Sequence, residues 1–151
     1  MLIQHVLVPT DLSEYADYAL TYAIKLAQKF RASLTLLHVI DTTPLGVAGW
    51  ETRLPPSHLQ DLETSIAQGM EALLGRIHDA GLQGEIAIVH GMPFQKIIDT
   101  TKDKGVDLIV MGTHGRTGLT HVLIGSVAEK VVRLAPCPVL VTRQATEAPT
   151  T

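Results

Sequence analysis

The residues best suited to chemistry lie in one glycine-rich stretch, GTHGRTGLTHVLIGS, at positions 112–126. Glycine lets a backbone approach a ligand closely, because it has no Cβ atom. Three glycines of the stretch are placed to do this: Gly112, Gly115 and Gly125. His114 and Arg116 add side-chain donors, and a helical pattern begins at Ser126, where the unpaired N–H groups of a helix start favour anions. Together these features predict a cradle for phosphate groups.

The same stretch also has a purely structural interpretation. Ser126 and Glu129 match a capping box, in which the two side chains satisfy backbone N–H groups at the start of their own helix. The glycines would then only shape a turn. Capping and binding can coexist, because one cap occupies only part of the exposed N–H groups. The residues alone leave both interpretations open.

Other phosphate-binding and catalytic motifs are absent from the sequence. There is no GKS or GKT of a P-loop, no G-x-G-x-x-G dinucleotide fingerprint and no G-x-S-x-G nucleophile elbow. No metal site is expected either, because His114 and His121 share a loop without a cysteine or a close carboxylate pair at ligand spacing. His38 is predicted to be a buried, hydrogen-bonded core residue.

The glycine stretch must be held by the elements around it, and these alternate along the chain. Short apolar runs predict five strands, over residues 2–8, 32–40, 85–90, 107–111 and 139–142. Apolar residues at helical spacing predict helices between them, from 16 to 30, 59 to 77, 94 to 98 and 127 to 134. This alternation predicts an α/β fold with a parallel sheet covered by helices on both faces.

Such a sheet binds ligands beyond the carboxyl ends of its strands, where the strand order reverses. The candidate loops are residues 9–12, those after Asp41, 91–93 and 112–125. The segment 41–57 holds the only tryptophan, Trp50, and lacks periodicity, so it is either a functional flap or a mobile loop. We expect one domain over residues 1–143 and a disordered tail over 144–151.

Composition excludes several classes of protein. A net charge of −3 and 4% aromatic residues leave neither a broad basic surface nor stacking platforms for nucleic acid. The single cysteine, Cys137, excludes an intramolecular disulfide. No apolar run approaches the ~20 residues that span a bilayer, and the first residues lack the charged start of a signal peptide. We therefore expect a cytoplasmic protein with no membrane partner.

The glycine spacing resembles that of a known family. Gly112-x-x-Gly115, nine further residues and then Gly125-Ser126 match the G-2x-G-9x-G-(S/T) signature of ATP-binding universal stress proteins. HVLVPTDLSEYADYAL resembles the family's first strand and helix, and CPVLVTR its last strand. The resemblance covers about residues 3–143. It implies a Rossmann-like domain of five parallel strands in the order 3-2-1-4-5, usually a homodimer.

Carried over by position, the resemblance implies a set of ATP contacts: Pro9, Thr10, Asp11, Val39, Met111, Gly112, Gly115, Gly125, Ser126 and Val127. With the donors His114 and Arg116, these are the candidate site residues. Asp11 accepts hydrogen bonds and repels phosphates, so we expect it at the nucleoside end, although it can also cap the first helix. Val39 can offer its backbone to the adenine edge. Whether Mg²⁺ accompanies ATP is left open.

Three functions remain: an ATP-binding regulatory module of the stress response, a phosphoryl-transfer enzyme that uses ATP, and a nucleotide-free dimeric scaffold. An enzyme needs a metal-holding carboxylate and a base near the phosphates, and residues 112–126 include no Asp or Glu. A scaffold leaves the glycine signature unexplained. The sequence favours the binding module, at most a slow ATPase. In the implied strand order Val139–Thr142 lies at a sheet edge, which predicts a homodimer through this strand.

Overall fold

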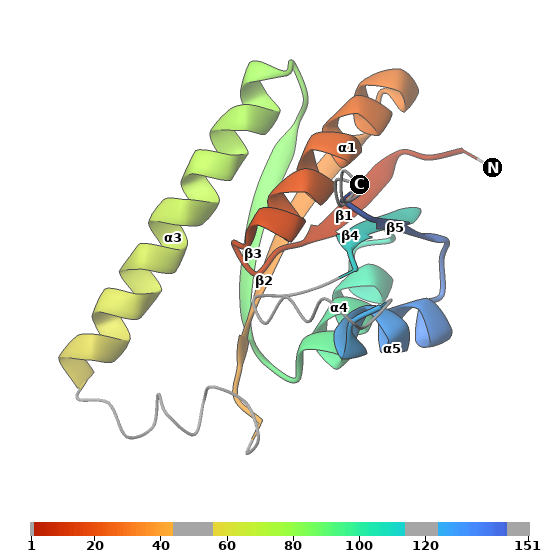
Figure 1. Cartoon of the computed structure of the whole chain (residues 1–151). Helices are drawn as coiled ribbons and strands as arrows, with labels where there is room; N and C mark the ends of the chain where they lie inside the picture. Colours follow the sequence, from red (N-terminus) through yellow and green to blue (C-terminus); the bar gives the residue numbers. More distant parts are fainter. Residues whose placement is uncertain (1, 44–55, 114–123, 145–151) are drawn as a thin grey trace, which may run out of the picture.

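The computed structural model describes residues 2–43, 56–113 and 124–144 (Figure 1). Within them lie nine elements: β1 (His5–Pro9), α1 (Glu14–Phe30), β2 (Ser33–Asp41), α3 (Pro56–Asp79), β3 (Gly84–Gly91), α4 (Pro93–Asp103), β4 (Leu108–Gly112), α5 (Ser126–Leu134) and β5 (Val139–Thr142). His114, Gly115, Arg116 and Trp50, and the tail beyond residue 144, lie outside the described residues.

The strands form one parallel sheet in the order β3-β2-β1-β4-β5, which confirms the predicted fold. Some predicted bounds were wrong. β1 starts at His5, after the exposed Leu2, and β2 continues to Asp41 while α3 already begins at Pro56. The segment expected to lack periodicity over 41–57 is therefore shorter at both ends. Proline suits a helix start, because its missing N–H would have no partner there.

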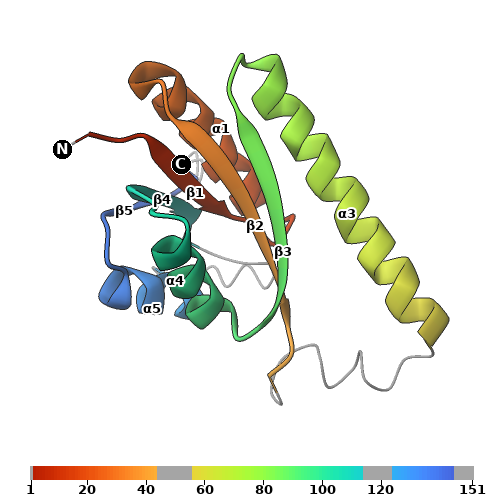
Figure 2. The ribbon, with the colours of Figure 1, turned by 180° about the vertical axis from the view of Figure 1, so that it is seen from behind.

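Helices cover both faces of the sheet. Figures 1 and 2 show α1 and α3 on one face and α4 and α5 on the other. β2 supplies both cores in alternation: Leu36 packs in the cluster with α1 and α3, and Leu37 in the cluster with α4 and α5. This follows from the period of two along a strand. A sheet buried on both faces also explains why its strands read as nearly continuous apolar runs.

Some apolar residues predicted for helix faces are exposed. On α5, Val131 is buried, whereas Val132 is 49% and Leu134 53% exposed. Phe30 at the end of α1 is also exposed. Only one stripe of a helix can face the sheet, and the residue after Val131 is turned about 100° away from it.

The topology fixes where a ligand can enter. β1 lies between β2 and β4. The chain passes from β1 to β2 and β3 on one flank of β1, and then crosses to β4 on the other flank. The loops after β1 and β4 therefore diverge at the carboxyl ends of these strands, and a crevice is expected between them.

Candidate functional site

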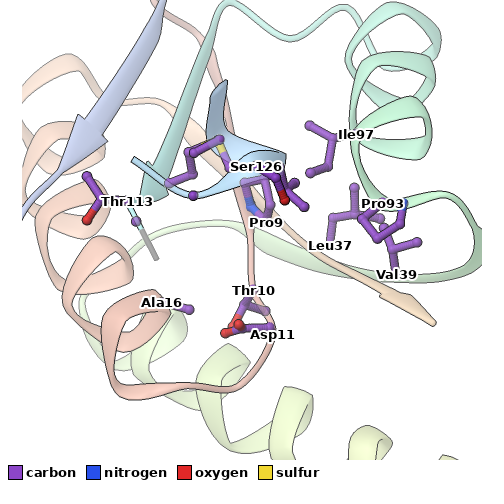
Figure 3. A pocket seen from close by; sticks show the side chains of 15 residues that line it. Pro9, Thr10, Asp11, Ala16, Leu37, Val39, Pro93, Ile97, Thr113 and Ser126 are labelled. Atoms are coloured by element: carbon purple, nitrogen blue, oxygen red, sulfur yellow. The ribbon is translucent and has the colours of Figure 1, made fainter. Parts of the chain in front are cut away.

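A cavity of about 260 Å³ lies at the carboxyl ends of β1, β2 and β4 (Figure 3). Every candidate residue that the structure describes lines it: Pro9, Thr10, Asp11, Val39, Met111, Gly112, Gly125, Ser126 and Val127. The fold thus brings together residues from the end of β1, from β2, from the end of β4 and from the start of α5, which are distant in sequence. The remaining candidates, His114, Gly115 and Arg116, fall outside the described residues.

The turn from β1 to α1 is built by local hydrogen bonds. Thr10 Oγ1 accepts from the Leu12 N–H at 3.1 Å, and Asp11 Oδ1 accepts from the Ser13 N–H at 2.9 Å. The N-cap of α1 is Ser13, whose Oγ accepts from the Ala16 N–H at 3.3 Å. The helix cap considered as an alternative role for Asp11 therefore belongs to Ser13. Asp11 instead shapes the turn and lines the cavity.

Leu12 in the same turn has a left-handed backbone with a φ of 65°. A leucine in this conformation is strained and persists where its surroundings hold it. Its side chain packs over Gly69 of α3, where an added Cβ would lie 3.2 Å from Leu12 Cδ1. The glycine on α3 thus leaves room for Leu12, and this packing helps to fix the turn that carries Asp11.

Val39 directs its backbone toward the cavity. In the β1–β2 ladder, the Ser33 N–H donates to Gln4 O at 2.9 Å and the Thr10 N–H donates to Leu37 O at 2.8 Å. Backbone groups of alternate strand residues point to the same neighbouring strand, so the N–H and C=O of Val39 face the side of β1, as those of Leu37 do. Because β1 ends opposite Leu37, the Val39 groups face the space beyond it.

Gly112 needs its missing side chain for a reason that the sequence did not indicate. A Cβ at this position would meet the backbone oxygen of Tyr15 in α1 at 3.0 Å. The close approach of α1 to the end of β4 therefore favours glycine, whether or not a ligand is bound. Gly125 is different: its φ of −72° and ψ of 161° are available to any residue.

The start of α5 differs from the predicted capping box. Gly125 is the N-cap, Ser126 is the first helical residue, and no described side chain caps the helix. The Gly125 carbonyl accepts from the Glu129 N–H at 2.9 Å, while the Glu129 carboxylate accepts from Arg133 at 2.7 Å. The prediction that Ser126 caps α5 was wrong. Among the described residues, no side chain therefore caps the first-turn N–H groups of α5 beside the cavity.

Thr113 is a lining residue that sequence reasoning missed. It is buried; its N–H donates to Thr142 O at 3.2 Å, and its carbonyl accepts from the Gly125 N–H at 2.5 Å. These bonds join the ends of β4 and β5 to the start of α5. Both use backbone atoms, so the side-chain type gave no signal; the only clue was the position of Thr113 inside the glycine stretch.

The cavity has two chemically different sides. Figure 3 shows Leu37, Val39, Pro93 and Ile97 gathered on one side, with Thr10 and Asp11 on another part of the wall. Leu37, Pro93 and Ile97 were not predicted, although Pro93 lies in a candidate loop. An apolar slot beside backbone donors and acceptors suits a flat heterocyclic ring. A helix start without a side-chain cap suits an anion.

Charged groups contribute little to the cavity wall. Among the described lining residues, Asp11 is the only ionisable side chain. Within the same described part of the chain, no three His, Cys, Asp or Glu residues are grouped so that they could hold a metal ion. Hydrogen bonds lower the pKa of Glu85 and burial raises the pKa of Cys137, but neither residue lines the cavity.

No helix in the described part of the chain is long and apolar enough to cross a membrane.

Known proteins are similar to this chain in sequence and fold. Universal stress protein MJ0577 of Methanocaldococcus jannaschii is 35% identical over 158 residues, which cover 95% of this chain and 97% of the relative. A solved structure of hypothetical protein MJ0577 matches with a TM-score of 0.85 at 33% identity, covering 97% of this chain and 100% of the other. Universal stress protein UspA from Lactobacillus plantarum matches with a TM-score of 0.81 at 32% identity, covering 95% of this chain and 99% of the other.

Two more distant structures share the fold and were solved with nucleotides. One is a universal stress protein in complex with cAMP, with a TM-score of 0.70 at 24% identity, covering 95% of this chain and 98% of the other. The second is the universal stress protein from Archaeoglobus fulgidus in complex with dAMP. It has a TM-score of 0.66 at 21% identity and covers 93% of this chain and 98% of the other.

The family model for universal stress proteins matches residues 2–143, nearly the whole chain. With this match and relatives at this level of identity, the chain belongs to the universal stress protein family.

Proposed function

We propose that this chain binds ATP in the cavity and acts as a nucleotide-binding regulatory module of the stress response. One observation carries the proposal: the fold gathers every described candidate residue around one cavity, next to a helix start that no described side chain caps. The structural alternative, in which Ser126 and Glu129 satisfy that helix start themselves, does not occur.

The two chemically different sides of the cavity determine how the nucleotide is oriented in it. The adenine ring lies in the apolar slot of Leu37, Pro93 and Ile97, with its edge on the Val39 backbone. The ribose hydroxyls donate to Asp11, and the phosphates lie at the start of α5. Structures of the same fold have been solved with cAMP and dAMP, which also carry adenine. The support for ATP in this chain is the cavity itself.

Replacing Gly125 with valine tests the phosphate end. The φ of −72° and ψ of 161° at Gly125 are allowed for valine, so the variant adds bulk at the start of α5 without backbone strain. We expect ATP to bind more than about tenfold more weakly. Gly75→Ala is the matched control, because a Cβ there meets nothing within 4 Å. Calorimetry that finds unchanged ATP affinity in Gly125→Val would refute the proposed site.

The ligand that the protein holds in the cell can be identified directly. Protein purified without added nucleotide is denatured, and the released small molecules are identified by mass spectrometry. We expect ATP or an adenine nucleotide derived from it. A stoichiometric ligand of another class would overturn the proposal.

A further inference from the structure

His38 bonds to the turn that carries Asp11. It is buried in β2, on the face covered by α1 and α3, because its neighbours Leu36 and Ile40 belong to that core. Its Nδ1 lies 2.8 Å from the carbonyl oxygen of Thr10. A carbonyl oxygen only accepts hydrogen bonds, so Nδ1 carries the proton and donates. The predicted core role of His38 is confirmed, but its partner is the backbone of the β1–α1 turn.

This bond reaches the carbonyl at which the sheet ladder would continue. The Thr10 N–H still donates to Leu37 O at 2.8 Å, one step beyond the end of β1. In a parallel ladder with this register, the next bond would run from the Val39 N–H to the Thr10 carbonyl. The Thr10 carbonyl instead accepts from the His38 side chain. The β1–β2 ladder therefore ends one bond before the Val39 N–H.

We propose that His38 is a positioning residue that keeps the Val39 backbone available for the adenine base. By drawing the Thr10 carbonyl toward its ring and away from the Val39 N–H, it ends the β1–β2 ladder and directs the turn with Asp11 toward α1. The inference rests on the proposed function and goes beyond it, because it makes a buried residue that does not line the cavity responsible for base selectivity.

The chemistry of the bases explains why selectivity depends on this arrangement. The Val39 N–H can donate to adenine N1 while the Val39 carbonyl accepts from the adenine N6 amine. Guanine presents an N1–H donor and an O6 acceptor at the corresponding positions, so both contacts would become mismatched. If the ladder consumed the Val39 N–H, the donor that recognises adenine would be lost, but the phosphate contacts would remain.

Two variants separate this role from a structural one. His38→Leu removes the donor at similar volume, whereas His38→Asn keeps an amide N–H near the position of Nδ1. Calorimetry with ATP, GTP and inorganic triphosphate is the readout. In His38→Leu we expect about tenfold weaker ATP binding, a reduced preference for ATP over GTP and unchanged triphosphate binding. His38→Asn should restore both affinity and preference. Equal losses for all three ligands, or no loss for ATP, would overturn the inference.

Hydrogen exchange in the unmodified protein covers the case in which His38→Leu does not fold. The amide of Val39 should exchange rapidly without ligand and become protected when ATP is added. Protection of this amide in ligand-free protein that does bind ATP would overturn the role of His38 alone. Unmodified protein that binds no nucleotide would overturn the proposed function, and this inference with it.

Discussion

Asp11 lies both in the turn before α1 and in the cavity wall, so its position alone fits a capping role and a ligand-binding role. Its carboxylate accepts from the Ser13 N–H, but the side chain that caps α1 is that of Ser13. A residue that binds nucleotide affects affinity, while one that only caps a helix affects stability. Variants of Asp11 and Ser13 therefore provide a matched pair that separates the two roles.

Asp11→Ala should weaken ATP binding by roughly ten- to a hundredfold, because it removes a charge-assisted hydrogen bond worth about 1.5–3 kcal/mol. Inorganic triphosphate, which lacks the nucleoside, should bind the variant no worse. Ser13→Ala should instead cost about 1 kcal/mol of stability and leave ATP affinity unchanged. Calorimetry and thermal unfolding of both variants make the comparison. ATP affinity that is the same in Asp11→Ala and in unmodified protein would exclude Asp11 from the nucleoside end.

ATP hydrolysis should be slow or absent, well below the ~10 s⁻¹ typical of enzymes. The reason lies in the cavity wall, where Asp11 is the only carboxylate among the described lining residues and is assigned to the ribose. Phosphoryl transfer needs a metal-holding carboxylate and a base near the phosphates. Phosphate release by purified protein with Mg²⁺ is the measurement. A turnover above about 1 s⁻¹ that disappears in Ser126→Ala would favour the enzyme instead.

The site was predictable from sequence where side-chain type carries the information. Glycine spacing and the run after β1 indicated residues that do line the cavity. The prediction failed where backbone geometry decides. Serine is preferred over glycine at an N-cap, yet Gly125 takes that position in α5. Thr113 acts through its N–H and carbonyl, and Gly112 leaves room for the backbone of α1.

At the scale of elements, hydrophobic periodicity was enough to predict the strands and helices, because a sheet buried on both faces imposes apolar runs on its strands. The strand order did not follow from periodicity; it came with the family resemblance. Bounds were wrong before β1, where Leu2 is exposed, and at the end of β2 and the start of α3.

A polar network joins the amino ends of the strands to α4. Thr35 Oγ1 donates to Glu85 of β3 at 2.9 Å, and Lys104 Nζ donates to the same oxygen at 2.8 Å. His5 Nε2 lies 2.7 Å from Thr35 Oγ1. The hydrogen bond from Lys104, followed by that from Thr35, lowers the pKa of Glu85 below its usual value of 4.5. The folded protein therefore holds this carboxyl ionised more strongly than the unfolded chain does.

The ionised Glu85 stabilises the folded protein more at neutral pH than in acid. A lowered pKa in the folded state stabilises the protein above the ordinary Glu value and loses that effect as the pH falls below about 4.5. Glu85→Gln should lower stability at neutral pH by less than about 1 kcal/mol, because the pair is half exposed, and should flatten the decline in acid. Urea unfolding at neutral and acid pH measures this. Glu71→Gln, an exposed carboxylate on α3, controls for charge. An acid decline as steep in Glu85→Gln as in unmodified protein would contradict the prediction.

On the scale of the whole molecule, β5 is an edge of the sheet, because it pairs only with β4. The Pro138 carbonyl accepts from the Ile109 N–H, and the Thr142 carbonyl from the Thr113 N–H, so even-numbered residues of β5 bond toward β4. The N–H and C=O groups of Val139 and Val141 therefore point outward. Exposed Val132 and Leu134 on α5 add apolar surface close to β5 in sequence.

We propose that two copies pair through this edge, since a symmetric pairing would close it in an isologous interface. Leu140 is a poor position to test this, because its side chain packs against the core with α1. Val141→Pro is better: it removes an outward N–H without breaking the β4–β5 ladder, and proline is tolerated at such edge positions. We expect sedimentation at micromolar concentration to give the mass of two chains for the unmodified protein and for Val141→Ala, which keeps the N–H, but of one chain for Val141→Pro. A one-chain mass for the unmodified protein would rule out the dimer at these concentrations. A two-chain mass for Val141→Pro would place the interface elsewhere.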